Sequence, residues 1–474
     1  MSDAKTDNDR RQPMSREQRL ALIIAILASF VSFLDGTVVT VALPAIQNDL
    51  GGGLTTQQWV VDAYLITLGA LILVAGSLSD VYGRILIIRI GLILFGITSI
   101  AIAAAPSAEF LIIARALQGV AGALLVPSSL ALITSNFRGP AQARAIGIWT
   151  AATTSAMIAG PLLGGLFVDL LSWRYVFVIN VVPIAVAMWL LAVLGHRDSP
   201  RGSGVKHRAK IDWVGAALCT VGLGGSVYAL IEQPTLGWSS PQIWIPLTVG
   251  VLSFAGFLVR QAFAREPMMP LGLFRIRNFW AGNVATAFIY AALSLNGFVV
   301  GVYLQQGAGL PATLAGLATL PGTLLMIAFS SRVGTLAGRW GPRLFMTIGP
   351  LIMAVGAVLL LTVSREFSYW TQVLPSVIVL GVGLVVTVSP LTSAILGSMD
   401  PSRSGIASAV NNAVSRIAGL LVIATLGAIV GGALDLTGLH RAAIVTAIFL
   451  AIGAVVSFAG IRNPPRSAPA AVIE

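Results

Sequence analysis

The chain has 474 residues, of which 56% are hydrophobic and only 10% are charged, and its mean hydropathy is +0.89. Soluble domains carry about 25% charged residues. The composition therefore excludes an ordinary soluble domain and predicts an integral membrane protein. The formal net charge of +11 would suggest a nucleic-acid partner only if the chain were soluble.

Long apolar runs follow one another along the whole sequence. A helix needs about 20 such residues to cross the ~30 Å hydrocarbon core of a bilayer. The runs cover residues 20–43, 58–78, 85–105, 109–132, 144–168, 175–195, 211–231, 243–261, 279–304, 312–335, 343–363, 370–396, 405–430 and 442–461. We therefore predict an all-α protein with fourteen transmembrane helices. The first run is too long for a signal peptide, so we expect it to remain as the first helix.

Lysine and arginine residues gather on alternate loops between the predicted helices. One side carries most of them, including a dense cluster within 196–210, and the other side carries only Arg174, Arg365 and Arg441. This is the positive-inside pattern, which places the basic loops in the cytoplasm. We expect both termini to be cytoplasmic, and we attribute the basic balance to orientation and not to nucleic acid.

A charged, glycine-rich loop motif occurs twice. The stretch GSLSDVYGR, 76–84, follows the second predicted helix, and a degraded copy, GTLAGRWGPR, 334–343, follows the tenth. Eight helices separate the copies, whereas duplication of a six-helix unit would give six. The repeat predicts two related six-helix bundles with an inserted helix pair and a substrate path between the bundles.

The predicted domain boundaries follow from this repeat and from the polar segments. They are a cytoplasmic tail at 1–19, the first bundle at 20–195, a linker at 196–210, two additional helices at 211–261, a linker at 262–278, the second bundle at 279–461 and a tail at 462–474.

Three charged residues lie inside predicted membrane helices, where each costs about 2.5 to 3.5 kcal/mol on insertion scales. Asp35 and Arg115 are at similar predicted depths of about 12 and 9 Å below the outer surface, so each could be the other's partner. Asp35 is either a structural carboxylate or a group that binds and releases protons, and Arg115 is either a fixed counterion or a coupling residue. Asp62, at about 6 Å depth, is either solvated or involved in coupling or cation attraction.

The fifth predicted helix is rich in small residues. Gly160 and Gly164 are four residues apart, with Gly165 adjacent and Pro161 between them. This spacing allows close helix packing, and proline permits a bend that could seal the path against proton leak. Aromatic and amide side chains could line a cavity for apolar cations. The candidates are Tyr64, Gln118, Trp149, Asn283, Tyr290, Asn296, Asn411 and Asn412.

Several kinds of chemistry are not indicated. No lysine follows a glycine, as the phosphate-binding Walker A motif requires, and the three histidines are dispersed in loops. Cys219 is the single cysteine and cannot form an intrachain disulfide. We expect no enzymatic activity, no metal and no cofactor.

Taken together, these motifs resemble those of the major facilitator superfamily over nearly the whole chain. Gly76, Asp80, Gly83 and Arg84 match its loop motif after the second helix. Other matches are Arg115, Gln118, Gly119 and Gly122 in the fourth helix and Gly147, Gly160, Pro161, Gly164 and Gly165 in the fifth, the "antiporter" motif. LDGTVVTVALP, 34–44, resembles the first-helix signature of the fourteen-helix drug:proton antiporters of QacA/EmrB type.

The resemblance implies proton-driven export of hydrophobic or cationic compounds by a monomer in the cytoplasmic membrane, without a cofactor. It gives Asp35 and Asp62 proton or cation roles, Arg115 a coupling role, and Asp80 with Arg84 the role of a conformational gate. The chain departs from the family pattern at two positions. Thr40 stands where asparagine is common in the first-helix signature, and Gly338 stands where the second copy of the loop motif would have an acidic residue. The alternatives are a dedicated exporter of one metabolite, lipid or antibiotic, and a proton-coupled importer, against which the fifth-helix glycines argue.

Overall fold

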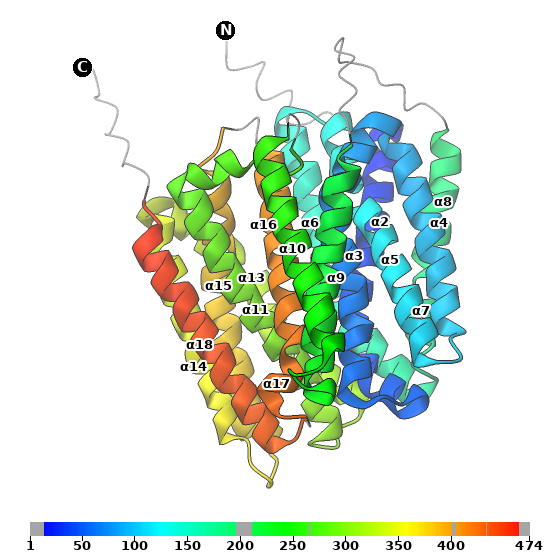
Figure 1. Ribbon diagram of the computed structural model, residues 1–474. Helices are drawn as coiled ribbons and strands as arrows, with labels where there is room; N and C mark the ends of the chain where they lie inside the picture. The colour runs from blue at the N-terminus through cyan, green and yellow to red at the C-terminus, as the bar shows by residue number, and fades with distance from the viewer. Residues whose placement is uncertain (1–13, 196–210, 265–266, 401–403, 433, 464–474) are drawn as a thin grey trace, which may run out of the picture.

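The computed structural model (Figure 1) describes residues 14–195, 211–264, 267–400, 404–432 and 434–463, and it contains no strand in these ranges. Fourteen helical segments of the described chain are long and apolar enough to cross a membrane, which confirms the predicted all-helical fold. The predicted linker at 196–210 and most of both predicted tails lie outside the described residues.

The first six predicted spans fold as α2 (Arg16–Leu50), α3 (Gly53–Tyr82), α4 (Arg84–Ala103), α5 (Ala108–Asn136), α6 (Gly139–Leu170), and α7 (Tyr175–Val178) with α8 (Val181–Leu194). We call this group the N-terminal half. The additional pair is α9 (Trp213–Leu236) and α10 (Pro241–Phe263).

The remaining spans form what we call the C-terminal half. After the short helix η1 (Leu271–Arg275) come α11 (Arg277–Gln306), α12 (Ala312–Ala318), α13 (Leu320–Trp340), α14 (Pro342–Leu359), η2 (Leu360–Thr362), η3 (Tyr369–Val373), α15 (Leu374–Leu396), α16 (Ser404–Ala424), α17 (Leu426–Val430) and α18 (Leu436–Gly460).

Three of the predicted spans are interrupted. The sixth breaks between α7 and α8, the tenth between α12 and α13, and the thirteenth between α16 and α17. Apolar periodicity does not reveal such breaks, because the residues around them remain apolar. The first break matters for the site, because Asn180 lies in it and is fully buried.

The additional pair packs on the flank of the molecule. Helix α9 contacts α3 and α16, one from each half, and α10 packs on α9. Gly222, Gly225 and Gly250 allow this approach: a Cβ added at Gly225 would lie 3.2 Å from the Gly250 Cα. Much of the outer surface of α10 remains exposed and apolar, as at Leu252 and Phe263, which suits contact with lipid.

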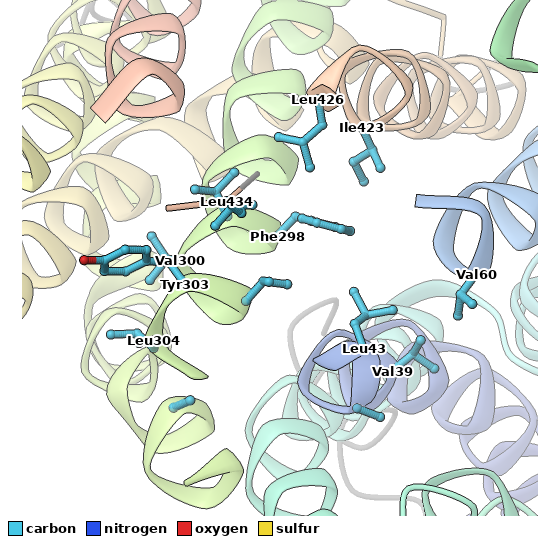
Figure 2. Close-up of a cluster of buried hydrophobic side chains, with 14 of the residues drawn as sticks. Val39, Leu43, Val60, Phe298, Val300, Tyr303, Leu304, Ile423, Leu426 and Leu434 are labelled. Carbon is cyan, nitrogen blue, oxygen red and sulfur yellow. The ribbon is translucent and has the colours of Figure 1, made fainter. Parts of the chain in front are cut away.

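The largest hydrophobic cluster that the two halves share lies near the outer ends of the helices, the side opposite the basic loops. A smaller cluster joins α3 and α16 to the additional pair. In Figure 2, Val39, Leu43 and Val60 of the N-terminal half lie opposite Phe298 and Ile423 of the C-terminal half. Two further clusters lie towards the basic side, and each belongs to one half alone. The outer side is therefore closed by apolar packing between the halves.

Hydrogen bonds between the halves occur at the same end. Gln58 on α3 donates to the Ile423 carbonyl at 2.6 Å, and Gln305 on α11 donates to the Val41 carbonyl at 3.1 Å. Asp169 at the end of α6 accepts from the backbone amides of Ala312 and Thr313 at the start of α12. These hydrogen bonds lie near the outer ends, where they add to the apolar packing that closes the outer side. The structure is therefore open towards the side that carries the basic loops.

The glycines of the fifth span differ in their surroundings. A Cβ at Gly164 would lie 2.7 Å from Val38 Cγ2 on α2, and one at Gly160 would meet Thr37. Gly165 abuts Thr313, and Pro161 abuts Gly316, both on α12 of the opposite half. Gly147, by contrast, has no other residue's atom within 4 Å of an added Cβ.

We expect Gly164→Val to destabilise the protein by about 1–3 kcal/mol, because the new side chain must displace α2 or α6. Gly147→Val, in the same helix, is the matched control and should have little effect. Thermal unfolding of the purified variants in a neutral detergent would measure both. Equal melting temperatures for the two variants would contradict the packing role of Gly164.

Candidate functional site

A buried ion pair joins two helices of the N-terminal half. Arg115 Nη1 on α5 lies 2.5 Å from Asp35 Oδ2 on α2, and the two residues are 1% and 0% exposed. Arg115 also donates from Nε to the Val60 carbonyl on α3 at 2.9 Å, and its guanidinium lies 4.4 Å from the centre of the Tyr64 ring. Asp35 and Arg115, whose predicted depths in the membrane are similar, are therefore partners.

Neutral side chains satisfy the second carboxylate oxygen. Gln118 Nε2 and Asn180 Nδ2 each donate to Asp35 Oδ1 at 3.2 Å, and both also lie within hydrogen-bond distance of Ser99. Gln118 Oε1 accepts from Arg115 at 2.6 Å. A buried ion pair is stabilised when further hydrogen bonds satisfy its remaining donors and acceptors, and this shell supplies such bonds to both Asp35 oxygens and to Arg115 Nη1.

Asp62 lies apart from that pair. Helix α3 begins at Gly53, five residues before the predicted start at 58, so Asp62 lies about 14 Å along the helix and not ~6 Å. It is 0% exposed, and neither carboxyl oxygen has a hydrogen-bond partner. This burial removes the alternative that Asp62 is simply solvated.

A cavity of about 510 Å³ lies between the halves beside the ion pair. That volume is in the range of small-molecule sites, about 300–1,000 Å³. Tyr64 and Arg115 line it from the N-terminal half, and Ser294, Phe298 and Arg416 line it from the C-terminal half. The Tyr64 hydroxyl shares a 3.0 Å hydrogen bond with Ser32.

The other predicted cavity residues have different positions. Gln118 belongs to the Asp35 shell, and the Trp149 indole donates to Ser29 at 3.1 Å on α2. Asn411 on α16 donates to Thr286 and Asn283 on α11, and Asn412 accepts from Arg416. Tyr290 packs with the inner cluster of the C-terminal half, and the buried Asn296 Oδ1 has no partner.

The predicted gate residues lie at the inner end of α3 and the start of α4. The exposed Asp80 and the half-buried Arg84 form an ion pair at 3.7 Å, and Gly83 takes a left-handed φ of 96° at the junction between the helices. Gly76 has open space around an added Cβ. Neither Asp80 nor Arg84 forms an ion pair with the opposite half within the described residues.

Three polar residues of this region are not among those that the sequence predicts. Arg416 lies within a predicted span, so the insertion cost applied to Arg115 could have found it. Asn180 and Asp169 carried no comparable signal, because amides are less costly and Asp169 lies at a helix end. No group of three or more His, Cys, Asp or Glu side chains in the described ranges could hold a metal ion.

The chain matches a known protein family over most of its length. The family model described as Major Facilitator Superfamily matches residues 25–423. The chain belongs to the major facilitator superfamily. The family consists of transporters and not enzymes, which agrees with the multi-pass fold.

Individual relatives of this superfamily are named for drug resistance or efflux. Methylenomycin A resistance protein of Bacillus subtilis is 34% identical over 86% of this chain and 87% of its own length. Multidrug resistance protein Stp of Mycobacterium tuberculosis is 33% identical over 90% of this chain and 78% of its own length. Multidrug efflux pump LfrA of Mycolicibacterium smegmatis is 34% identical over 86% of this chain and 80% of its own length.

Solved structures of transporters share the fold. An auto-inhibited POT family peptide transporter superimposes with a TM-score of 0.68 at 15% identity, covering 96% of this chain and 99% of that one. The inward-open xylose transporter XylE from E. coli superimposes with a TM-score of 0.65 at 14% identity, covering 94% of this chain and 96% of that one. At these identities the likeness concerns the major facilitator fold alone.

We expect Asp169→Ala to favour opening of the outer side, because it removes the acceptor of two backbone amides and the Thr313 hydroxyl across the halves. A net loss of about 1.5 kcal/mol would raise the outward-facing population about tenfold. Spin labels at Leu171→Cys and Arg365→Cys, in a Cys219→Ser background, would report longer distances by pulsed electron paramagnetic resonance.

Asp49→Ala provides the control for this measurement. It breaks the Arg174–Asp49 ion pair, which lies on the same outer side but within one half. An unchanged distance distribution in Asp169→Ala, or an equal change in Asp49→Ala, would contradict the gating role of Asp169.

Proposed function

We propose that this chain is a proton-coupled antiporter that exports hydrophobic drugs from the cytoplasm by alternating access. The observation that carries the proposal is the buried Asp35–Arg115 pair beside a drug-sized cavity between the halves. The names of the resistance and efflux relatives support drug export. Fourteen apolar segments support membership of the fourteen-helix drug:proton antiporters of QacA/EmrB type.

The remaining expectations form part of the same proposal. The protein would reside as a monomer in the cytoplasmic membrane, with both termini in the cytoplasm, and the proton gradient would drive it without a cofactor. Residues 20–195 and 279–461 would act as the two moving bundles. The family resemblance implies hydrophobic or cationic substrates. Because two arginines line the cavity, it favours hydrophobic compounds over cations.

The contacts of Asp35 support a role for this carboxylate in proton coupling. In the inward-facing structure the carboxylate is held by Arg115, Gln118 and Asn180. Protonation of Asp35 would cancel its charge and weaken the ion pair that joins α2 to α5. Arg115 would keep its bonds to Gln118 and to the Val60 carbonyl, so its charge would become available to the cavity it lines. Proton and substrate could thus influence each other through one guanidinium.

A dedicated exporter of one compound is the alternative. The relatives include cephamycin export protein CmcT of Amycolatopsis lactamdurans, 32% identical over 87% of this chain and 85% of its own length. A panel of chemically different antibiotics and metabolites in one transport assay would separate broad from dedicated export.

We expect Asp35→Asn to abolish coupling, because asparagine preserves the shape but cannot bind and release a proton near neutral pH. In inverted vesicles carrying an imposed proton gradient, substrate should release protons in the parent protein and at least tenfold more slowly in the variant. Asp49→Asn, at the outer end of the same helix, is the control carboxylate and should behave like the parent. Normal exchange by correctly inserted Asp35→Asn would overturn the proposed coupling.

A further inference from the structure

Arg416 gives the central cavity an uncompensated positive charge. Two arginines, Arg115 and Arg416, line the cavity. No aspartate or glutamate among the described residues lines it. Arg115 is neutralised by Asp35, which lies fully buried behind it. Arg416 forms no ion pair with any described carboxylate, and the partnerless Asp62 is not part of the cavity wall.

The hydrogen bonds of Arg416 leave most of its donors free. Its Nε donates to the neutral Asn412 amide oxygen one turn earlier on α16, at 2.8 Å. In the described part of the chain, its two terminal nitrogens make no hydrogen bond, and the side chain is partly exposed to the cavity. A guanidinium offers five N–H donors in a planar fork that matches a carboxylate or phosphate.

The position of Arg416 makes this exposure costly without a ligand. It lies eight residues before the end of α16 at Ala424, about 12 Å along the helix, and therefore deep within the membrane span. Charged side chains at such depth mark substrate or ion pathways. The surrounding wall is amphipathic: Ser294 contributes a hydroxyl against α16, and Phe33, Phe298 and Ile423 contribute apolar surface.

We propose that the cavity selects amphipathic monoanions, molecules with an apolar body and one carboxylate or comparable anionic group, and that Arg416 binds that group. The inference rests on the proposed export function and names its substrate class. One negative charge neutralises the site, because Asp35 and Arg115 cancel each other. A cation would instead lie beside a like charge. A membrane potential that is negative inside also favours export of an anion.

The test uses two probes that share one apolar body and differ in charge, pyrenebutyrate and pyrenebutyl-trimethylammonium. Binding to the purified full-length protein in a neutral detergent would be followed by fluorescence anisotropy. We expect the anion to bind at least tenfold more tightly than the cation. Arg416→Gln should weaken anion binding at least tenfold without weakening cation binding, and Arg416→Lys should restore part of the preference.

Arg174→Gln removes an arginine from the outer surface and should leave both affinities unchanged. Equal or tighter binding of the cation by the parent protein would overturn the proposal, as would anion binding that survives Arg416→Gln. The lysine variant shows whether a loss in Arg416→Gln reflects charge or misfolding. If both Arg416 variants fail to fold, the parent's preference between the two probes decides.

Transport measurements separate this inference from the proposed export function. Selective anion binding without substrate-driven proton release in vesicles would contradict the coupling and leave the anion site standing. Proton release driven by the cationic probe alone would support the coupling and overturn the anion site.

Discussion

The structure depends on keeping a carboxylate and a guanidinium together in an apolar interior. An ion pair of this kind is stable only when every remaining donor and acceptor has a partner. Asp35 and Arg115 obtain theirs from Gln118, Asn180 and the Val60 carbonyl. Asn180, at the break between α7 and α8, and the Val60 carbonyl on α3 thereby join the contact between α2 and α5. The same shell places the ion pair against the cavity wall.

The two halves meet through contacts that can separate. At the outer end they share apolar packing and hydrogen bonds with backbone groups, such as those that Asp169 accepts from the amides at the start of α12. These bonds are exposed or half-buried at a helix start, so water can replace them when the halves part. At the inner end, Asp80 remains exposed and bonded only to its neighbour Arg84 in the described structure. In the proposed mechanism of alternating access, a carboxylate at each end would alternate in holding the opposite half.

The additional helices add surface without entering the central site. Helix α9 bonds the N-terminal half through Glu232, which accepts from the Trp59 indole at 2.8 Å, and it also packs on α16. A second, almost wholly apolar cavity of about 460 Å³ lies beneath the pair and is lined by Cys219 and Phe257. The single cysteine is therefore a buried packing residue and forms no part of the charged site.

The sequence alone determined the membrane class and the number of spans, because these depend on local hydropathy. It also identified Asp35 and Arg115, because charge within an apolar run is conspicuous whatever the packing. Local pattern could not decide which helix faces turn towards each other. Only the tertiary structure shows that Asp35 pairs with Arg115, 80 positions away in the sequence. It also shows that Asp62 is buried without a hydrogen-bond partner, that Asn180 donates to Asp35, and that Asp169 accepts from the opposite half. It also placed Arg416 on the wall of a cavity without a carboxylate, because the sign of a site depends on the sum of charges brought there from both halves.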